Sequence, residues 1–286
     1  MVKIALKKFG RIPKETEKEI LGIIKECYER LPHSVELLDI LLFENPSFMK
    51  SFYFLERRAV GVVTEDFGDS FLARHDAWRG TPRIAVCLET MERAPRLIQI
   101  GSLRHEVGHS ILHGSIEYYV FPITKKLAET SRKFNLPKGY SFNLTYLISI
   151  AVKDFEVAKL LLGGGYVRDQ IAYSRYLLKP SKDDLTAWRL SEGNPALMAL
   201  CLAGRLKDLA CLIALSPTVG RKHTIKKMME EGLSYLPREA LGRMLKFAEK
   251  LPRTMVGDTF QNFNIAMDMF IEDLLSPLLE AKLRST

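Results

Sequence analysis

The residues of this chain that could carry out chemistry are concentrated in one pentapeptide, His105-Glu106-Val107-Gly108-His109. On a helix, positions i and i+4 share one face, so the two imidazoles would project towards one point. Two histidines at this spacing can bind one metal ion, and a third protein ligand and a water complete a catalytic zinc site. We therefore predict that His105 and His109 are zinc ligands, and that Glu106 is the general base that accepts a proton from the water.

The third ligand is expected on a later apolar helix at 141–162, where two carboxylates are candidates. Asp154 shares its helix face with apolar residues, and a carboxylate buried there is costly unless it is paired or bound to a metal. Those apolar residues are at positions 147, 150, 151, 157, 158 and 161. Glu156 lies about 200° further around the helix, near Lys153 and Lys159, which favours surface ion pairing. We predict that Asp154 is the third ligand, with Glu156 as the alternative ligand or an outer partner.

His113 is the nearest other candidate ligand. On a continuous helix it would lie about 12 Å along the axis from His105, which is too far for both to bind one ion. The apolar pattern continues to Leu112, and Gly114 is the expected helix end. His113 is therefore predicted to lie at the helix end, outside the metal's own ligand set.

The motif helix followed by an acidic helix resembles the zincin metallopeptidases, and within them the gluzincin-like branch. Metzincins would need Gly and His where this chain has Leu112 and Ser115. Most gluzincins supply Glu as the third ligand, often within an E-x-x-x-D arrangement that does not start at Glu156. The Ile-Ala-x-x-Asp pattern ending at Asp154 is similar to zincin relatives that supply Asp.

The resemblance implies hydrolysis of a peptide or protein substrate with one bound Zn²⁺. It also implies a sheet before the motif helix, with an edge strand that aligns an extended peptide beside the metal. Residues 83–89 (Arg-Ile-Ala-Val-Cys-Leu-Glu) are the candidate for that strand. An alternative function is a binding or regulatory protein that keeps the zincin scaffold and the metal but does not cleave its partner. The general base Glu106 argues against that alternative, because a non-catalytic site has no evident need of it.

The elements that must position these residues predict an α+β fold. A small N-terminal sheet would precede a mainly helical zincin-like core and a helical C-terminal region, with a catalytic domain at 1–180 and the C-terminal region at 181–286. A first helix is expected at 14–31. Strands are expected at 35–44, 60–65, 70–78 and 83–89. Later helices are expected at 96–113, 124–134, 141–162, 194–215, 224–231, 238–250 and 262–282.

The composition excludes several other classes of protein. With 47% hydrophobic and 27% charged residues, the chain is typical of a globular protein rather than a disordered or fibrous one. The formal charge of +8 is spread over isolated Lys and Arg pairs, which argues against a nucleic-acid site. Charges interrupt the most apolar window and no secretory signal is evident, so we expect no membrane span and a cytoplasmic protein. The four cysteines, without C-x-x-C spacing, are expected to be reduced core residues.

Overall fold

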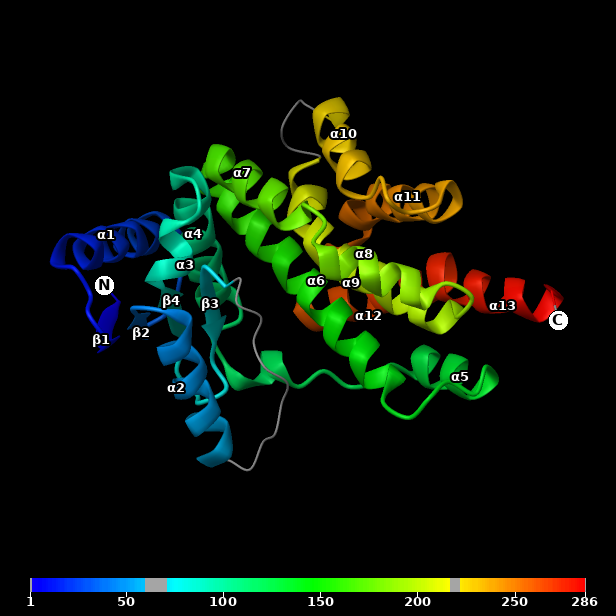
Figure 1. Cartoon of the computed structure of the whole chain (residues 1–286), viewed down its shortest axis with the longest axis horizontal. Helices are drawn as coiled ribbons and strands as arrows, with labels where there is room; N and C mark the ends of the chain where they lie inside the picture. The colour runs from blue at the N-terminus through cyan, green and yellow to red at the C-terminus, as the bar shows by residue number, and fades with distance from the viewer. Residues whose placement is uncertain (1, 60–70, 217–221, 286) are drawn as a thin grey trace. The chain divides into compact units, whose positions relative to one another are not determined.

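The fold is α+β, as predicted, with a small sheet near the N-terminus followed by helices (Figure 1). The computed structural model describes residues 2–59, 71–216 and 222–285. The strand expected at 60–65 lies outside the described residues. The strands are β1 (Lys3–Phe9), β2 (Leu37–Phe43), β3 (Ala73–Asp76) and β4 (Arg83–Cys87).

Helices account for most of the remaining described chain. The first group is α1 (Lys14–Arg30), α2 (Pro46–Ala59), α3 (Leu88–Glu92), α4 (Arg96–Leu112) and the short η1 (Ile116–Tyr119). The second group is α5 (Lys125–Lys133), α6 (Tyr140–Gly163), α7 (Val167–Leu178), α8 (Lys182–Ser191) and α9 (Pro195–Leu215). The last group is α10 (Lys222–Gly232), α11 (Arg238–Thr254), α12 (Thr259–Phe270), the π-helical η2 (Ile271–Leu275) and α13 (Ser276–Ser285).

The predicted helices with long apolar periodicity are confirmed, and the differences concern shorter or more polar elements. Strand β1, the short η1 and helices α2, α3, α7 and α8 were not predicted. Strand β1 lies at the edge of the sheet, and its exposed lysines hide the alternation that reveals a half-buried strand. The helix expected at 262–282 is two α-helices joined by the π-helical turn η2. The cysteines are free thiols, and three of the four are buried, as expected of reduced core residues.

The sheet has the order β1-β2-β4-β3. Strands β1, β2 and β4 are parallel, whereas β3 runs antiparallel to β4. The prediction that residues 83–89 form the edge strand is therefore wrong, because β4 lies between β2 and β3. All five residues of β4 are buried, as is typical of an internal strand covered on both faces. On this side of the sheet, the edge strand is β3.

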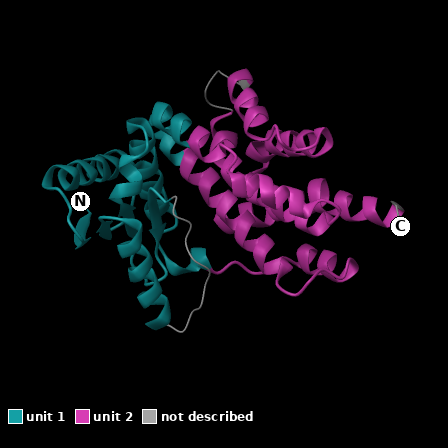
Figure 2. Cartoon of the chain, in the orientation of Figure 1, with its two compact units in different colours: residues 1–119, 160–173 teal, residues 120–159, 174–286 magenta. Residues whose placement is uncertain are grey.

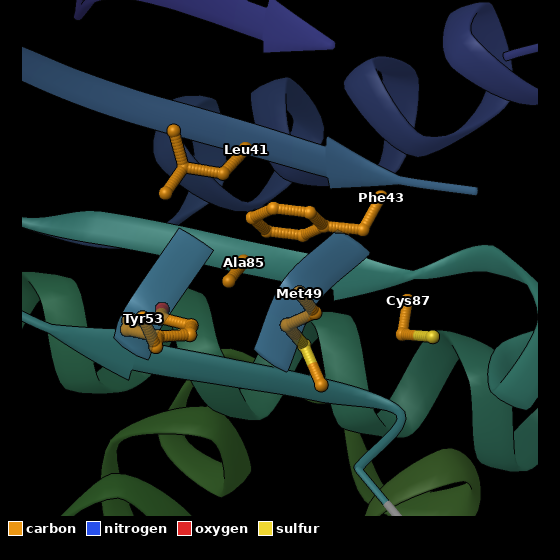
Figure 3. Packing of buried hydrophobic residues seen from close by; sticks show 6 residues of the cluster. All are labelled: Leu41, Phe43, Met49, Tyr53, Ala85 and Cys87. Atoms are coloured by element: carbon orange, nitrogen blue, oxygen red, sulfur yellow. The ribbon is translucent and has the colours of Figure 1, made fainter. Parts of the chain in front are cut away.

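Helix α2 covers one face of the sheet through a compact apolar cluster. The cluster joins side chains of β2 and β4 to two residues of α2 (Figure 3). Its buried members are Leu41, Phe43, Met49, Tyr53, Ala85 and Cys87. Phe9 of β1 stacks on Phe43 with ring centroids 4.7 Å apart, which extends the cluster to the first strand.

A buried charge network ties the edge strand to its neighbours. Arg83 of β4 donates from both terminal nitrogens to Glu56 of α2, at 2.8 and 2.9 Å, and from Nε to Asp76 of β3, at 2.8 Å. Tyr53 also donates to Asp76. Burial opposes the charge on Arg83, but the hydrogen bond with Glu56 and the negative charge of Asp76 raise the pKa of the guanidinium above its usual value. The network thus holds β3 through a permanently charged arginine.

We expect that Arg83→Met lowers the free energy of unfolding by about 3–5 kcal/mol, because it leaves the Asp76 carboxylate buried without its cation. Urea unfolding followed by circular dichroism measures this loss. The matched control is Arg79→Met, since Arg79 is half exposed and only approaches Glu56 at 3.5 Å. That exposed pair is expected to contribute at most about 1 kcal/mol. Equal stability of the two variants would contradict a structural role for the Arg83 network.

The chain divides into two compact units (Figure 2). Unit 1 comprises residues 1–119 and 160–173, and unit 2 comprises residues 120–159 and 174–286. In unit 1, helix α4 packs against α1 and contacts β3 and β4. In unit 2, the apolar helix α9 contacts α8, α10, α11, α13 and η2 and forms the centre of a helical core. The boundary between a catalytic domain at 1–180 and a C-terminal region at 181–286 stays a prediction. Across residues 2–59, 71–216 and 222–285, no helix combines the length and apolar character needed to cross a bilayer.

Candidate metal centre

The pentapeptide lies in the second half of helix α4. The helix begins after Pro95 and ends where the His113 N–H donates to the His109 carbonyl oxygen at 2.7 Å. Leu103 and Val107 of α4 are buried, which anchors one face of the helix. The predicted helix and its end before Gly114 are therefore confirmed.

A polar network within unit 1 fixes the rotation of α4 just before the first histidine. Arg104 donates to Glu26 of α1 at 3.1 Å and pairs with Asp169 of α7 at 3.2 Å. Its guanidinium lies 4.2 Å from the centre of the Tyr166 ring, and Tyr166 in turn donates to Glu26. Three helices are thereby held together at the residue that precedes His105.

The two motif histidines point their Nε2 atoms at each other. These atoms are 3.1 Å apart, and the two rings are nearly perpendicular, at 82°. Two nitrogens bound to one zinc at 2.0–2.1 Å in tetrahedral geometry would be about 3.3 Å apart, so the arrangement fits the ion. His105 is buried, and its ring contacts that of Tyr173 with centroids 5.3 Å apart. The imidazoles therefore converge without rearrangement of the helix.

One group of three potential metal ligands occurs among the described residues, and it consists of His105, His109 and Asp154. Each offers one ligand atom, and these atoms all lie within 4.8 Å of one another. Asp154 is only 9% exposed, in keeping with its predicted place on the apolar face of α6. Cys211 of α9 points its thiol at the Asp154 carbonyl oxygen, 3.8 Å away. Two imidazoles and a carboxylate are a common donor set of catalytic zinc.

Glu156, the alternative ligand, accepts hydrogen bonds from another helix. Its carboxylate accepts hydrogen bonds from Thr259, at 2.8 Å, and from Asn262, at 2.6 Å, in the first turns of α12. Glu156 is therefore not the solvated surface residue that its place on the helix predicts. The carboxylate is partly buried because α12 packs over this side of α6 and supplies two donors.

Glu106 is held by the edge strand β3. Its Oε2 accepts the backbone N–H of His75 at 2.7 Å. The Cys87 N–H donates to the Leu72 carbonyl oxygen, so the backbone of residue 72 faces β4. In an antiparallel pair the residues of one strand face the partner strand alternately, so the backbone N–H and C=O of residue 75 face away from β4. The hydrogen bond therefore joins the outward edge of β3 to the predicted general base. This contact places the carboxylate at the sheet edge.

The comparisons with known proteins give no further lead. No family model matches the chain, and the searches of curated proteins and of solved structures gave no match either. The resemblance to zincins therefore stays a prediction from the sequence motif.

His75 is the site residue that sequence reasoning missed. The sequence predicts only that His75 lies in the strand expected at 70–78. In the structure its ring stacks on that of His109, with centroids 5.9 Å apart and planes 7° from parallel. Its Nδ1 is 3.3 Å from the hydroxyl of Tyr119. The sequence carries no signal for this role, because 30 residues separate His75 from the motif and no local spacing joins them.

Proposed function

We propose that this chain is a zinc-dependent peptidase of zincin type, in which His105, His109 and Asp154 hold one ion and Glu106 acts as general base. The observation that supports the proposal is the convergence of the His105 and His109 rings on one point, next to a Glu106 carboxylate that strand β3 holds. When bound, zinc would supply a Lewis acid for the scissile carbonyl and lower the pKa of an attacking water.

The protein's own residues account for the proton transfers. Glu106, held in place by the His75 N–H, accepts a proton from the water and passes it to the leaving amine. The hydrogen bond with β3 fixes the position of the Glu106 carboxylate before it acts. A pair of imidazoles together with a fixed carboxylate base favours a hydrolytic site over a site that only binds metal.

Strand β3 supports a peptide as the substrate. It is the edge strand nearest α4, and its residue His75 contacts both the carboxylate of Glu106 and the ring of His109. An extended peptide that lies along a strand edge is a recurring mode of recognition. A peptide along β3 would pass directly beside the general base.

The test combines metal analysis with a search for cleavage. The purified chain is loaded with zinc and freed of excess metal, its zinc content is measured, and a peptide library is incubated with it and analysed by mass spectrometry. About one zinc per chain, together with cleavage that a chelator abolishes, supports the proposal. One zinc per chain without cleavage of any library member would instead favour the non-catalytic binding protein, and absence of zinc would overturn the metal site itself.

A further inference from the structure

His113 makes a specific contact with the outer side of a proposed metal ligand. The Nδ1 atoms of His109 and His113 lie 3.3 Å apart, within hydrogen-bonding distance. The Nε2 atom of His109 faces His105 on the other side of the same ring. His113 therefore approaches His109 from the side opposite to the proposed ion, and this geometry places it outside the ligand set.

The position of the single ring proton of His109 decides which of the two nitrogens is the donor. A histidine that binds a metal through Nε2 carries its single ring proton on Nδ1. The Nδ1–H of His109 can then donate a hydrogen bond to the Nδ1 atom of His113, which accepts it while His113 carries its own proton on Nε2. The pair can form this bond only when His113 is neutral and in that tautomer.

The surroundings of His113 hold its ring in place. The residue is 1% exposed and lies at the C-terminal cap of α4, where its N–H completes the last hydrogen bond of the helix. Its ring meets that of Tyr118 edge to face, with centroids 5.1 Å apart. An acceptor fixed by burial, backbone and an aromatic neighbour is well suited to orient another side chain.

We infer that His113 is a positioning residue that fixes the tautomer and ring orientation of His109 for metal binding. Outer partners of metal-bound histidines are usually carboxylates, carbonyls or waters, and their loss typically costs roughly 10- to 100-fold in metal affinity. Here an imidazole would serve, so the partner orients the ligand without adding a negative charge. The inference rests on the proposed metal site but not on hydrolysis.

The test measures zinc affinity by chelator competition in H113F and H113N. Phenylalanine fills the ring volume without an acceptor, and we expect zinc affinity to fall by roughly 10- to 100-fold. Asparagine can place an amide oxygen near the position of Nδ1, and we expect it to restore most of the affinity. If H113F does not fold, H113Q replaces it, because the longer amide reaches the position of Nε2 rather than that of Nδ1.

The control is H33F, which alters a partly buried histidine of unit 1 whose ring packs against Tyr28. It is expected to bind zinc like the wild type. The absorption spectrum of the cobalt-loaded protein is a second readout, and H113F should change it whereas H33F should not. Wild-type zinc affinity in H113F, or an equal loss in H113F and H113N, would overturn the inference. If the wild-type chain binds no zinc, the proposed function fails first, so the two failures are distinguishable.

Discussion

Replacing Glu106 by Gln is expected to lower kcat for peptide hydrolysis by about 10²- to 10⁴-fold, the usual contribution of a general base. The amide keeps the shape of the side chain, and its oxygen can still accept the His75 N–H, so the sheet edge and the helix stay in place. What is lost is the ability to take a proton from water. Steady-state kinetics on a cleaved library peptide measures the effect, and zinc content is expected to stay near one per chain.

The control for this experiment is Glu117→Gln, which removes a carboxylate from the exposed turn η1 that follows the motif helix. Its kcat should match that of the wild type. Turnover by the Glu106 variant within a few-fold of the wild-type value would refute the proposed mechanism. Loss of zinc from that variant would show instead that Glu106 belongs to the ligand set.

The second large effect is expected from Asp154→Asn, which should weaken zinc binding by more than the roughly 10- to 100-fold that loss of an outer partner costs. The substitution removes the charge of a ligand and keeps its volume. Because the amide keeps the volume of the side chain, thermal unfolding of the metal-free variant separates weaker zinc binding from a loss of stability. Chelator competition and thermal unfolding without metal measure the two properties.

The matched control for Asp154→Asn is Glu156→Gln, which changes a carboxylate two residues further along the same helix. It should leave zinc affinity unchanged, but it weakens the acceptor of Thr259 and Asn262. We expect the free energy of unfolding to fall by about 1–3 kcal/mol, as for hydrogen bonds to a charged group. The reverse pattern, with zinc retained by Asp154→Asn and lost from Glu156→Gln, would assign the third ligand to Glu156.

Much of the fold followed from local periodicity. The motif helix α4, its end before Gly114 and the apolar helices α6 and α9 were predictable, because a repeat of 3.6 residues marks one buried face and glycine favours a helix end. The α+β class followed from short β-rich runs ahead of these helices. Strand β1 escaped prediction because its lysines hide the alternation of a half-buried strand, and helix α2 was missed although its buried Met49 and Tyr53 lie at helical spacing.

The candidate site, like the fold, was predictable in part from the sequence. Spacing alone predicted that His105 and His109 share a helix face, since i and i+4 positions are neighbours in any α-helix. It also placed Asp154 on an apolar face, and that carboxylate is indeed buried. These are properties of one helix at a time, and a sequence reports them directly.

Tertiary structure decided which neighbours the helices meet. Glu156 seemed a surface residue until α12, about a hundred residues later, supplied two hydrogen-bond donors. Strand β4 seemed an edge strand until β3 paired with it and brought His75 beside the motif. Periodicity specifies which face of an element is buried but not what buries it, because the partner lies far away in the sequence and is chosen by packing.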